Sequence, residues 1–243
     1  FIGSHSGASG AWVSGPEDLD TPYKWGYANM TTAEALFAVG DASGASSHKF
    51  SSGSHTEGRI AGKAAVKYIV EKGAEPNVDM AKVEELKAEI LKPFELVEKH
   101  KDEFSDIEVN TNYIMPRQFL HRLQKIMDEY AGGVTSAFKT SKSLLERGLE
   151  LMDMLKEDAD KQGARDLHEL MRVWENIQRM WIAESHVRTM LFREETRWPG
   201  YYFRADTPKM DEENWHCFAN CRWNPGSGEW ETMKRDVWNI PGV

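Results

Sequence analysis

The feature that most constrains the fold is a change of pattern near residue 74. Beyond Gly73 and Pro76 the sequence shows helical periodicity almost throughout, whereas the part before is rich in glycine, serine and small side chains. Nearly all of the net charge of −9 lies in the later part. We therefore expect an α+β chain with three regions, namely residues 1–74, a mainly helical region 75–196, and a tryptophan-rich tail 197–243 that lacks any period and should be irregular.

The helical region predicts about four helices. The first covers residues 78–104 and should end or kink at Pro93, because proline has no amide hydrogen to donate. Pro116 suits the first turn of the second helix, and the glycine pair 132–133 should end it. Apolar side chains at helical spacing define the other two helices and should face one another: Leu144, Leu145, Leu149, Met152 and Leu155, then Leu167, Leu170, Met171, Trp174, Ile177 and Trp181.

A strand, a loop and a helix are expected in sequence within the first region. The apolar run 35–39 predicts a short buried strand, which ends in a tight turn at Gly40 and Asp41. A glycine- and serine-rich loop follows. The next segment should be a helix from Thr56 as N-cap to Lys72, with an apolar stripe on one face.

This strand–loop–helix unit has the residue types of a nucleotide or cofactor site. A carboxylate at the end of a strand, here Asp41, can accept hydrogen bonds from ribose or ribityl hydroxyls. The loop amides and the helix N-terminus favour an anionic or electron-rich group, and Lys49 and His55 add cationic or proton-donating side chains. The alternative is a purely structural loop, since the chain has no complete G-x-G-x-x-G fingerprint.

His5 lies in a second glycine-rich loop, GSHSGASG. Glycines allow the backbone to approach a ligand closely, and the imidazole between them could donate a proton to a bound oxyanion. An ordinary loop histidine is the alternative. Because the sequence begins at Phe1 with a loop of a kind that normally follows a strand, we expect a fragment of a longer protein.

Several function classes are disfavoured by composition. The acidic balance repels a phosphate backbone and argues against general nucleic-acid binding. No apolar run approaches the about 18 residues that span a membrane. Cys217 and Cys221 are too few to hold an iron–sulfur cluster and suggest a reducing compartment, so we expect no metal site and a cytoplasmic location.

Three long stretches of the sequence carry a resemblance to a known family. They include MTTAEALFAVGDASGASSHKFSSGSHTEGRIA and LFREETRWPGYYFRADTPKMDEENWHCF, and the likeness covers essentially the whole chain. The chain resembles the C-terminal part of the flavoprotein subunits of dissimilatory adenylylsulfate reductases, within the fumarate reductase and succinate dehydrogenase superfamily. The resemblance implies the end of a Rossmann-like FAD-binding domain, followed by a helical domain.

The resemblance also implies roles for particular residues. His5 corresponds to a substrate-contacting histidine, and Gly40 and Asp41 take the place of a flavin-contacting A-G-E-like motif, with aspartate for glutamate. Ser54 and His55 match positions that contact the flavin at the start of a helix. Two substrate-binding positions also follow from the match, Lys49 and Phe50.

Lys49 and Phe50 also bear on the choice of substrate. Lys49 stands where fumarate-type enzymes have arginine, and a lysine cannot clamp a dicarboxylate bidentately. Phe50 could stack on adenine, although a core phenylalanine is equally consistent with the sequence. The resemblance thus favours an adenosine-containing substrate.

The reaction implied is the interconversion of adenylyl sulfate with AMP and sulfite on FAD. A ferredoxin-like iron–sulfur beta subunit with two [4Fe–4S] clusters would deliver the electrons, with an indirect link to a membrane electron-transfer complex. The segment alone should be inactive, because part of the cofactor site lies upstream. Two alternatives remain: another flavoprotein of the superfamily acting on a dicarboxylate, and a non-enzymatic helical interaction module.

Overall fold

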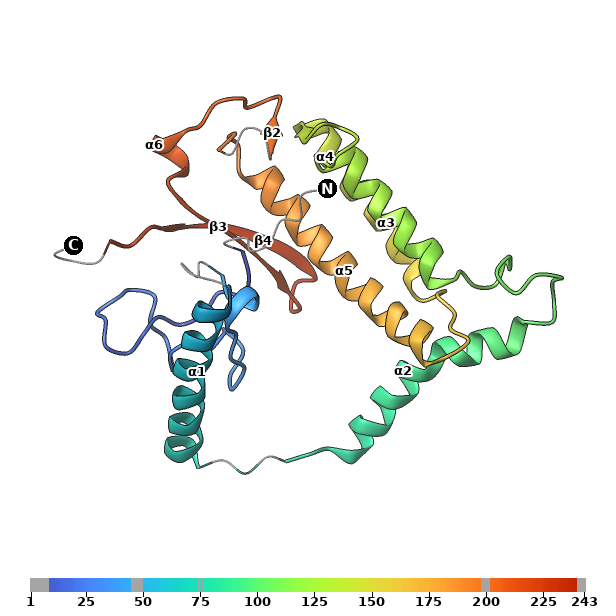
Figure 1. The fold of residues 1–243 in the computed structure, drawn as a ribbon, viewed down its shortest axis with the longest axis horizontal. Helices are drawn as coiled ribbons and strands as arrows, with labels where there is room; N and C mark the ends of the chain where they lie inside the picture. The colour runs from blue at the N-terminus through green and yellow to red at the C-terminus, as the bar shows by residue number, and fades with distance from the viewer. Residues whose placement is uncertain (1–8, 45–49, 74, 76, 198–201, 240–243) are drawn as a thin grey trace. The chain divides into compact units, whose positions relative to one another are not determined.

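The computed structural model contains both helices and strands, in agreement with the predicted mixed architecture (Figure 1). It divides into two units, Phe1–Val78 with Trp238–Val243, and Asp79–Val237. Among the described residues, no helix has the length and apolar character needed to cross a membrane. The residues that the structure describes are 9–44, 50–73, 75, 77–197 and 202–239.

The first unit consists of loops held by isolated bridges, a short 3-10 helix, η1 (Gly40–Ala42), and the long helix α1 (Phe50–Lys72). The predicted buried strand at residues 35–39 is wrong, because that run makes a single bridge at Phe37 and leaves Leu36 58% exposed. Ala35 has a φ of 63°, which interrupts the extended backbone that a strand needs.

Helix α1 begins at Phe50, so the prediction of Thr56 as its N-cap is wrong. The Thr56 hydroxyl lies within the helix and donates to the carbonyl of Ser52 at 2.9 Å. Serine and glycine are weak helix formers, so the serine- and glycine-rich sequence before Thr56 predicts a loop. Here the packing of this segment against η1 outweighs that propensity, since Gly53 and Gly40 are both buried.

Of the helices in the described part of the second unit, four lie where the sequence predicts them: α2 (Met80–His100), α3 (Pro116–Tyr130), α4 (Lys142–Ala159) and α5 (Leu167–Phe192). The side chains of Asp79, Ser141 and Asp166 cap the N-termini of α2, α4 and α5, respectively, by accepting hydrogen bonds from backbone amides of the first turn. Pro93 does not end α2, which continues through it. Both Pro93 and Val97 are buried, and this packing offsets the backbone hydrogen bond that proline removes.

Helices α3, α4 and α5 lie side by side around one apolar core (Figure 1). Phe119 of α3 and Leu145 and Met152 of α4 are fully buried, and Met180 and Val187 of α5 pack against them. The prediction that the apolar stripes of α4 and α5 face one another is wrong for α5. Leu170, Trp174 and Ile177 lie in a separate cluster with Phe94 of α2, and Leu167, Met171 and Trp181 are exposed. The strand β1 (Lys139–Thr140), which joins α3 to α4, forms a minimal parallel pair with β2 (Phe203–Arg204), which follows α5.

The tail is more regular than predicted. After the short helix α6 (Glu212–Trp215), the strands β3 (Cys217–Asn224) and β4 (Glu229–Asp236) form an antiparallel hairpin, so the expectation of an irregular segment is wrong there. The cross-strand pair Trp223–Trp230, with ring centroids 5.7 Å apart, helps to fix its register. Most side chains of both strands are partly exposed. The sequence therefore lacks the strict alternation of apolar and polar residues that predicts a half-buried strand.

The hairpin packs on α5. The Thr189 hydroxyl lies 3.3 Å from the Sγ of Cys221, and the ring of Trp181 contacts Trp223 and Trp230. Cys217 and Cys221 are both free thiols.

Buried charges fix the chain where α5 ends. Glu195 has no exposed surface and accepts hydrogen bonds from the guanidinium groups of Arg193 and Arg197 and from the amide of Asp211. Arg204 is equally buried and donates to the carbonyls of Met190 at 2.6 Å and Arg193 at 3.1 Å. These carbonyls belong to the end of α5, so Arg204 supplies both the hydrogen bonds and the positive charge that a helix C-terminus favours.

Asp206 should make the second unit sensitive to acid. The Arg204 guanidinium beside Asp206 holds the pKa of that carboxyl below its usual value. Because the pKa of Asp206 is lower in the folded than in the unfolded protein, the carboxylate stabilises the fold at pH values above its unfolded pKa of about 3.9. This stabilisation is lost as the pH falls through the lower pKa of the folded state. We expect Asp206→Asn to flatten the fall in stability below about pH 4, as measured by urea unfolding from pH 2 to 6. An unchanged acid dependence, equal to that of the control Asp160→Asn at an exposed position, would contradict this assignment.

Candidate functional site

The turn at Gly40 brings together residues that are distant in the sequence. Gly40 is buried with a φ of +59°, and its N–H donates to Oε2 of Glu57 in α1 at 2.6 Å. A Cβ placed on Gly40 would lie 2.7 Å from Oγ of Ser54, so η1 and α1 approach as closely as a glycine allows. Of the sequence-predicted site residues, Gly40 and Ser54 are therefore neighbours.

Asp41 and His55 are exposed next to this contact. Asp41 follows Gly40 within η1, and His55 follows Ser54 in α1. The arrangement offers a carboxylate that accepts hydrogen bonds, a hydroxyl that donates and accepts, and an imidazole that can do either. These groups suit a ligand with several hydroxyls, such as a ribityl or ribose chain.

The opening segment of the chain pairs directly with the residues after Asp41. The amide of Ala11 donates to the carbonyl of Ala42, and that of Gly44 donates to the carbonyl of Ala11, both at 2.8 Å. At Gly10 a Cβ would lie 2.6 Å from the backbone of Ser43, so only glycine fits there. Gly10 and Ala11 therefore lie against the turn that carries the candidate carboxylate.

Three of the predicted site positions are not placed by this geometry. His5 and Lys49 lie outside the described residues. Phe50 is the first residue of α1, and its side chain also lies outside them.

Glu57 is a residue of this site that the sequence analysis did not single out. It is the last residue of HKFSSGSHTE, the run that carries much of the family resemblance. That position in the motif was the available signal, but its partner at Gly40 appears only when the 3-10 turn is formed.

Gly40→Ala tests the close approach between η1 and α1. Alanine at a left-handed φ costs about 1–2 kcal/mol, and the clash with Ser54 should raise the total loss of unfolding free energy to about 2–4 kcal/mol. Gly73→Ala is the matched control, since Gly73 also has a φ of +59° but nothing within 4 Å of its added Cβ. Chemical denaturation should show the larger loss for Gly40→Ala, and Gly40→Ala with Ser54→Ala should recover part of it. Equal losses for the two glycine variants would contradict the contact.

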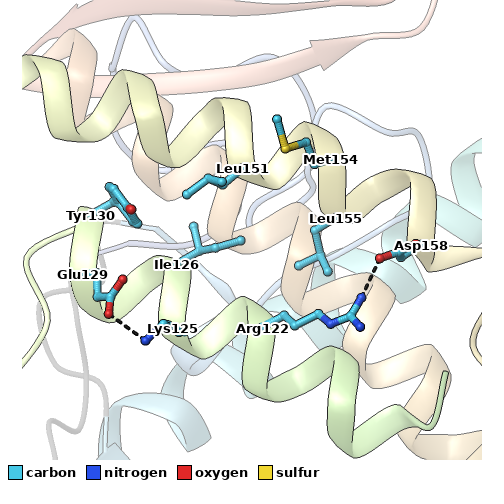
Figure 2. A pocket seen from close by; sticks show the side chains of 9 residues that line it. All are labelled: Arg122, Lys125, Ile126, Glu129, Tyr130, Leu151, Met154, Leu155 and Asp158. Atoms are coloured by element: carbon cyan, nitrogen blue, oxygen red, sulfur yellow. Dashed lines mark hydrogen bonds and ion pairs between the residues drawn. The ribbon is translucent and has the colours of Figure 1, made fainter. Parts of the chain in front are cut away.

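The hollows of the second unit contain none of the predicted site residues. One, of about 320 Å³, lies between α3 and α4 (Figure 2). Its apolar floor includes Ile126 and Leu155, and the ion pair Arg122–Asp158, at 2.6 Å, lies at its edge. The charges of this groove are already paired, so it shows no group poised for chemistry.

Comparison with known proteins identifies the class to which the chain belongs. The family model described as "Fumarate reductase flavoprotein C-term" matches residues 120–239. The fold and this match define the class: the chain belongs to the fumarate reductase flavoprotein family.

Within that family, the chain is similar to adenylylsulfate reductases. It is 46% identical over 99% of its length to the adenylylsulfate reductase subunit alpha of Megalodesulfovibrio gigas. The solved adenylylsulfate reductase of Archaeoglobus fulgidus matches 98% of the chain with 51% identity and a TM-score of 0.93. A structure of adenosine-5-phosphosulfate reductase in complex with sulfite (covalent adduct) matches 98% with 52% identity and a TM-score of 0.91. The chain spans 37–38% of the length of these relatives.

Proposed function

We propose that the chain is the C-terminal part of the flavoprotein subunit of an adenylylsulfate reductase. The reaction interconverts adenylyl sulfate with AMP and sulfite: two electrons enter, and the bond between the sulfo group and the phosphate oxygen breaks. The observation that carries this proposal is the 46–52% identity to adenylylsulfate reductases along almost the whole chain. FAD, when bound, would supply the electron pair.

The described residues fit part of an FAD site at the end of a Rossmann-like domain. Gly40, left-handed and closed off by Ser54, leaves no room for a side chain and lets η1 approach α1 closely, which brings Asp41 next to His55. The exposed Asp41 carboxylate can accept hydrogen bonds from ribityl or ribose hydroxyls. Ser54 and His55, in the first turns of α1, would hold polar atoms of the flavin near a helix N-terminus that favours electron-rich groups.

Substrate contacts are proposed for His5, Lys49 and Phe50. The imidazole of His5 would stabilise or protonate the sulfo group as negative charge moves to the leaving phosphate. Lys49 would contribute a positive charge, and Phe50 would offer a ring against adenine. Lysine at this position also argues against the dicarboxylate alternative, which requires a bidentate clamp.

The proposed partner is a ferredoxin-like subunit carrying two [4Fe–4S] clusters. An electron donor is needed because the reaction consumes two electrons. We place the complex in the cytoplasm, with an indirect link to a membrane electron-transfer complex.

The experiment is purification of the full-length subunit with its iron–sulfur partner. We expect bound FAD, seen as flavin absorbance, and sulfite-dependent formation of adenylyl sulfate from AMP when an added artificial electron acceptor takes up the two electrons released. Turnover of fumarate instead would favour the dicarboxylate alternative, and the absence of flavin would favour the interaction module. Residues 1–243 alone should retain little FAD and show no turnover, and robust activity of that segment would contradict the proposal that the site is shared with an upstream part.

A further inference from the structure

A hydrogen bond from the Gly40 amide connects α1 to the turn that carries Asp41. Oε2 of Glu57 accepts from the N–H of Gly40 at 2.6 Å, across 17 residues of sequence. Because the acceptor is a carboxylate, the bond belongs to the charge-assisted class, which is stronger than a bond between neutral groups. Gly40 is buried and Glu57 is half-buried, so an amide left without this acceptor would have poor access to water.

Both backbone groups of Gly40 are used. The N–H is held by Glu57, and the carbonyl accepts from the amide of Ser43 at 3.1 Å. Ser54 closes the remaining side of the residue, at 2.7 Å from the position of a Cβ. The orientation of the Gly40 peptide is therefore fixed, and with it the direction in which the chain leads into Asp41.

We propose that Glu57 is a positioning residue of the cofactor site. Its carboxylate fixes the Gly40 peptide and so directs the Asp41 carboxylate toward the hydroxyls of the bound nucleotide, without itself touching the ligand. The identity of that ligand as FAD rests on the proposed function, whereas the link between Glu57 and Gly40 rests on the geometry alone. Glutamine at position 57 keeps the length and the acceptor oxygen, while alanine removes both.

The first test measures FAD retention by the full-length subunit in its complex. The variants are Glu57→Ala, Glu57→Gln and the control Glu71→Ala, which removes another glutamate of α1, one that accepts from the Tyr27 hydroxyl at 2.8 Å. We expect Glu57→Ala to raise the dissociation constant for FAD about tenfold or more, because a buried amide loses its acceptor. The dissociation constant for FAD of Glu57→Gln should remain within about threefold of the wild-type value, and that of Glu71→Ala should equal the wild-type value.

The second test does not depend on the cofactor. Amide hydrogen exchange of the Gly40 peptide, measured on cofactor-free protein, should become about tenfold faster or more in Glu57→Ala and change little in Glu57→Gln. If Glu57→Ala does not accumulate, Glu57→Asp replaces it, since its carboxylate is one methylene too short to reach the same amide.

The outcomes separate the two proposals. The positioning role would be overturned if Glu57→Ala kept the wild-type rate of amide exchange and the wild-type FAD affinity. It would also be overturned if Glu57→Ala and Glu57→Gln lost equal amounts of FAD affinity, because the negative charge and not the acceptor oxygen would then be responsible. A wild-type subunit that binds no FAD would overturn the proposed function, while the exchange comparison would still decide whether Glu57 holds the Gly40 amide.

Discussion

Replacing Arg204 by alanine should lower the free energy of unfolding of the second unit by about 3–5 kcal/mol. The guanidinium has no exposed surface and makes hydrogen bonds to two carbonyls at the end of α5 and to the Asp206 carboxylate. Its removal takes one donor from each of these acceptors and opens a cavity, and each effect is destabilising. Chemical denaturation followed by circular dichroism at 222 nm measures the loss.

Arg222→Ala is the matched control for this variant. Arg222 also pairs with a carboxylate, at 2.6 Å from Glu231, but its side chain is 66% exposed. Water and salt screen such a pair, so the loss should be much smaller. Similar losses for both variants would contradict the view that burial makes Arg204 important, and Arg204→Lys should fall between the two because one ammonium cannot serve the same set of acceptors.

Replacing His5 by alanine in the full-length complex should lower turnover of adenylyl sulfate by about 100-fold or more, with FAD still bound. The expectation follows from the proposed role of the imidazole in stabilising charge that develops only in the transition state. Steady-state kinetics together with the flavin spectrum measure both quantities. The control is His100→Ala, at the end of α2, whose imidazole pairs with Glu103 at 2.8 Å. Near-normal turnover in His5→Ala would reduce His5 to a structural loop residue.

The helices of the second unit could be predicted because their signals are local. Residues such as Leu145 and Met152 recur at helical spacing, and Pro116 marks a helix start. The hairpin and the early start of α1 could not be predicted in this way. Strands β3 and β4 are specified by cross-strand pairs such as Trp223–Trp230, and the first turn of α1 is specified by contact with η1. Both depend on residues that are distant in the sequence.

The candidate site could be predicted in part. The resemblance assigns Gly40 and Ser54 separately to the flavin, and the structure shows that the two residues are in contact. The link from Glu57 to Gly40 was missed, since nothing local indicates where a half-buried carboxylate on a helix finds its donor. The burial of Glu195 and Arg204 was missed for a related reason, because charged residues are rarely buried unless they are paired.

The central claim is that the turn at Asp41 and the start of α1 form one wall of an FAD site. A crystal structure of the full-length subunit with bound FAD tests it most directly. The predicted result is an Asp41 carboxylate oxygen within about 2.5–3.0 Å of a ribityl or ribose hydroxyl, with the flavin over the first turns of α1. A flavin bound elsewhere, with Asp41 facing solvent, would contradict the claim.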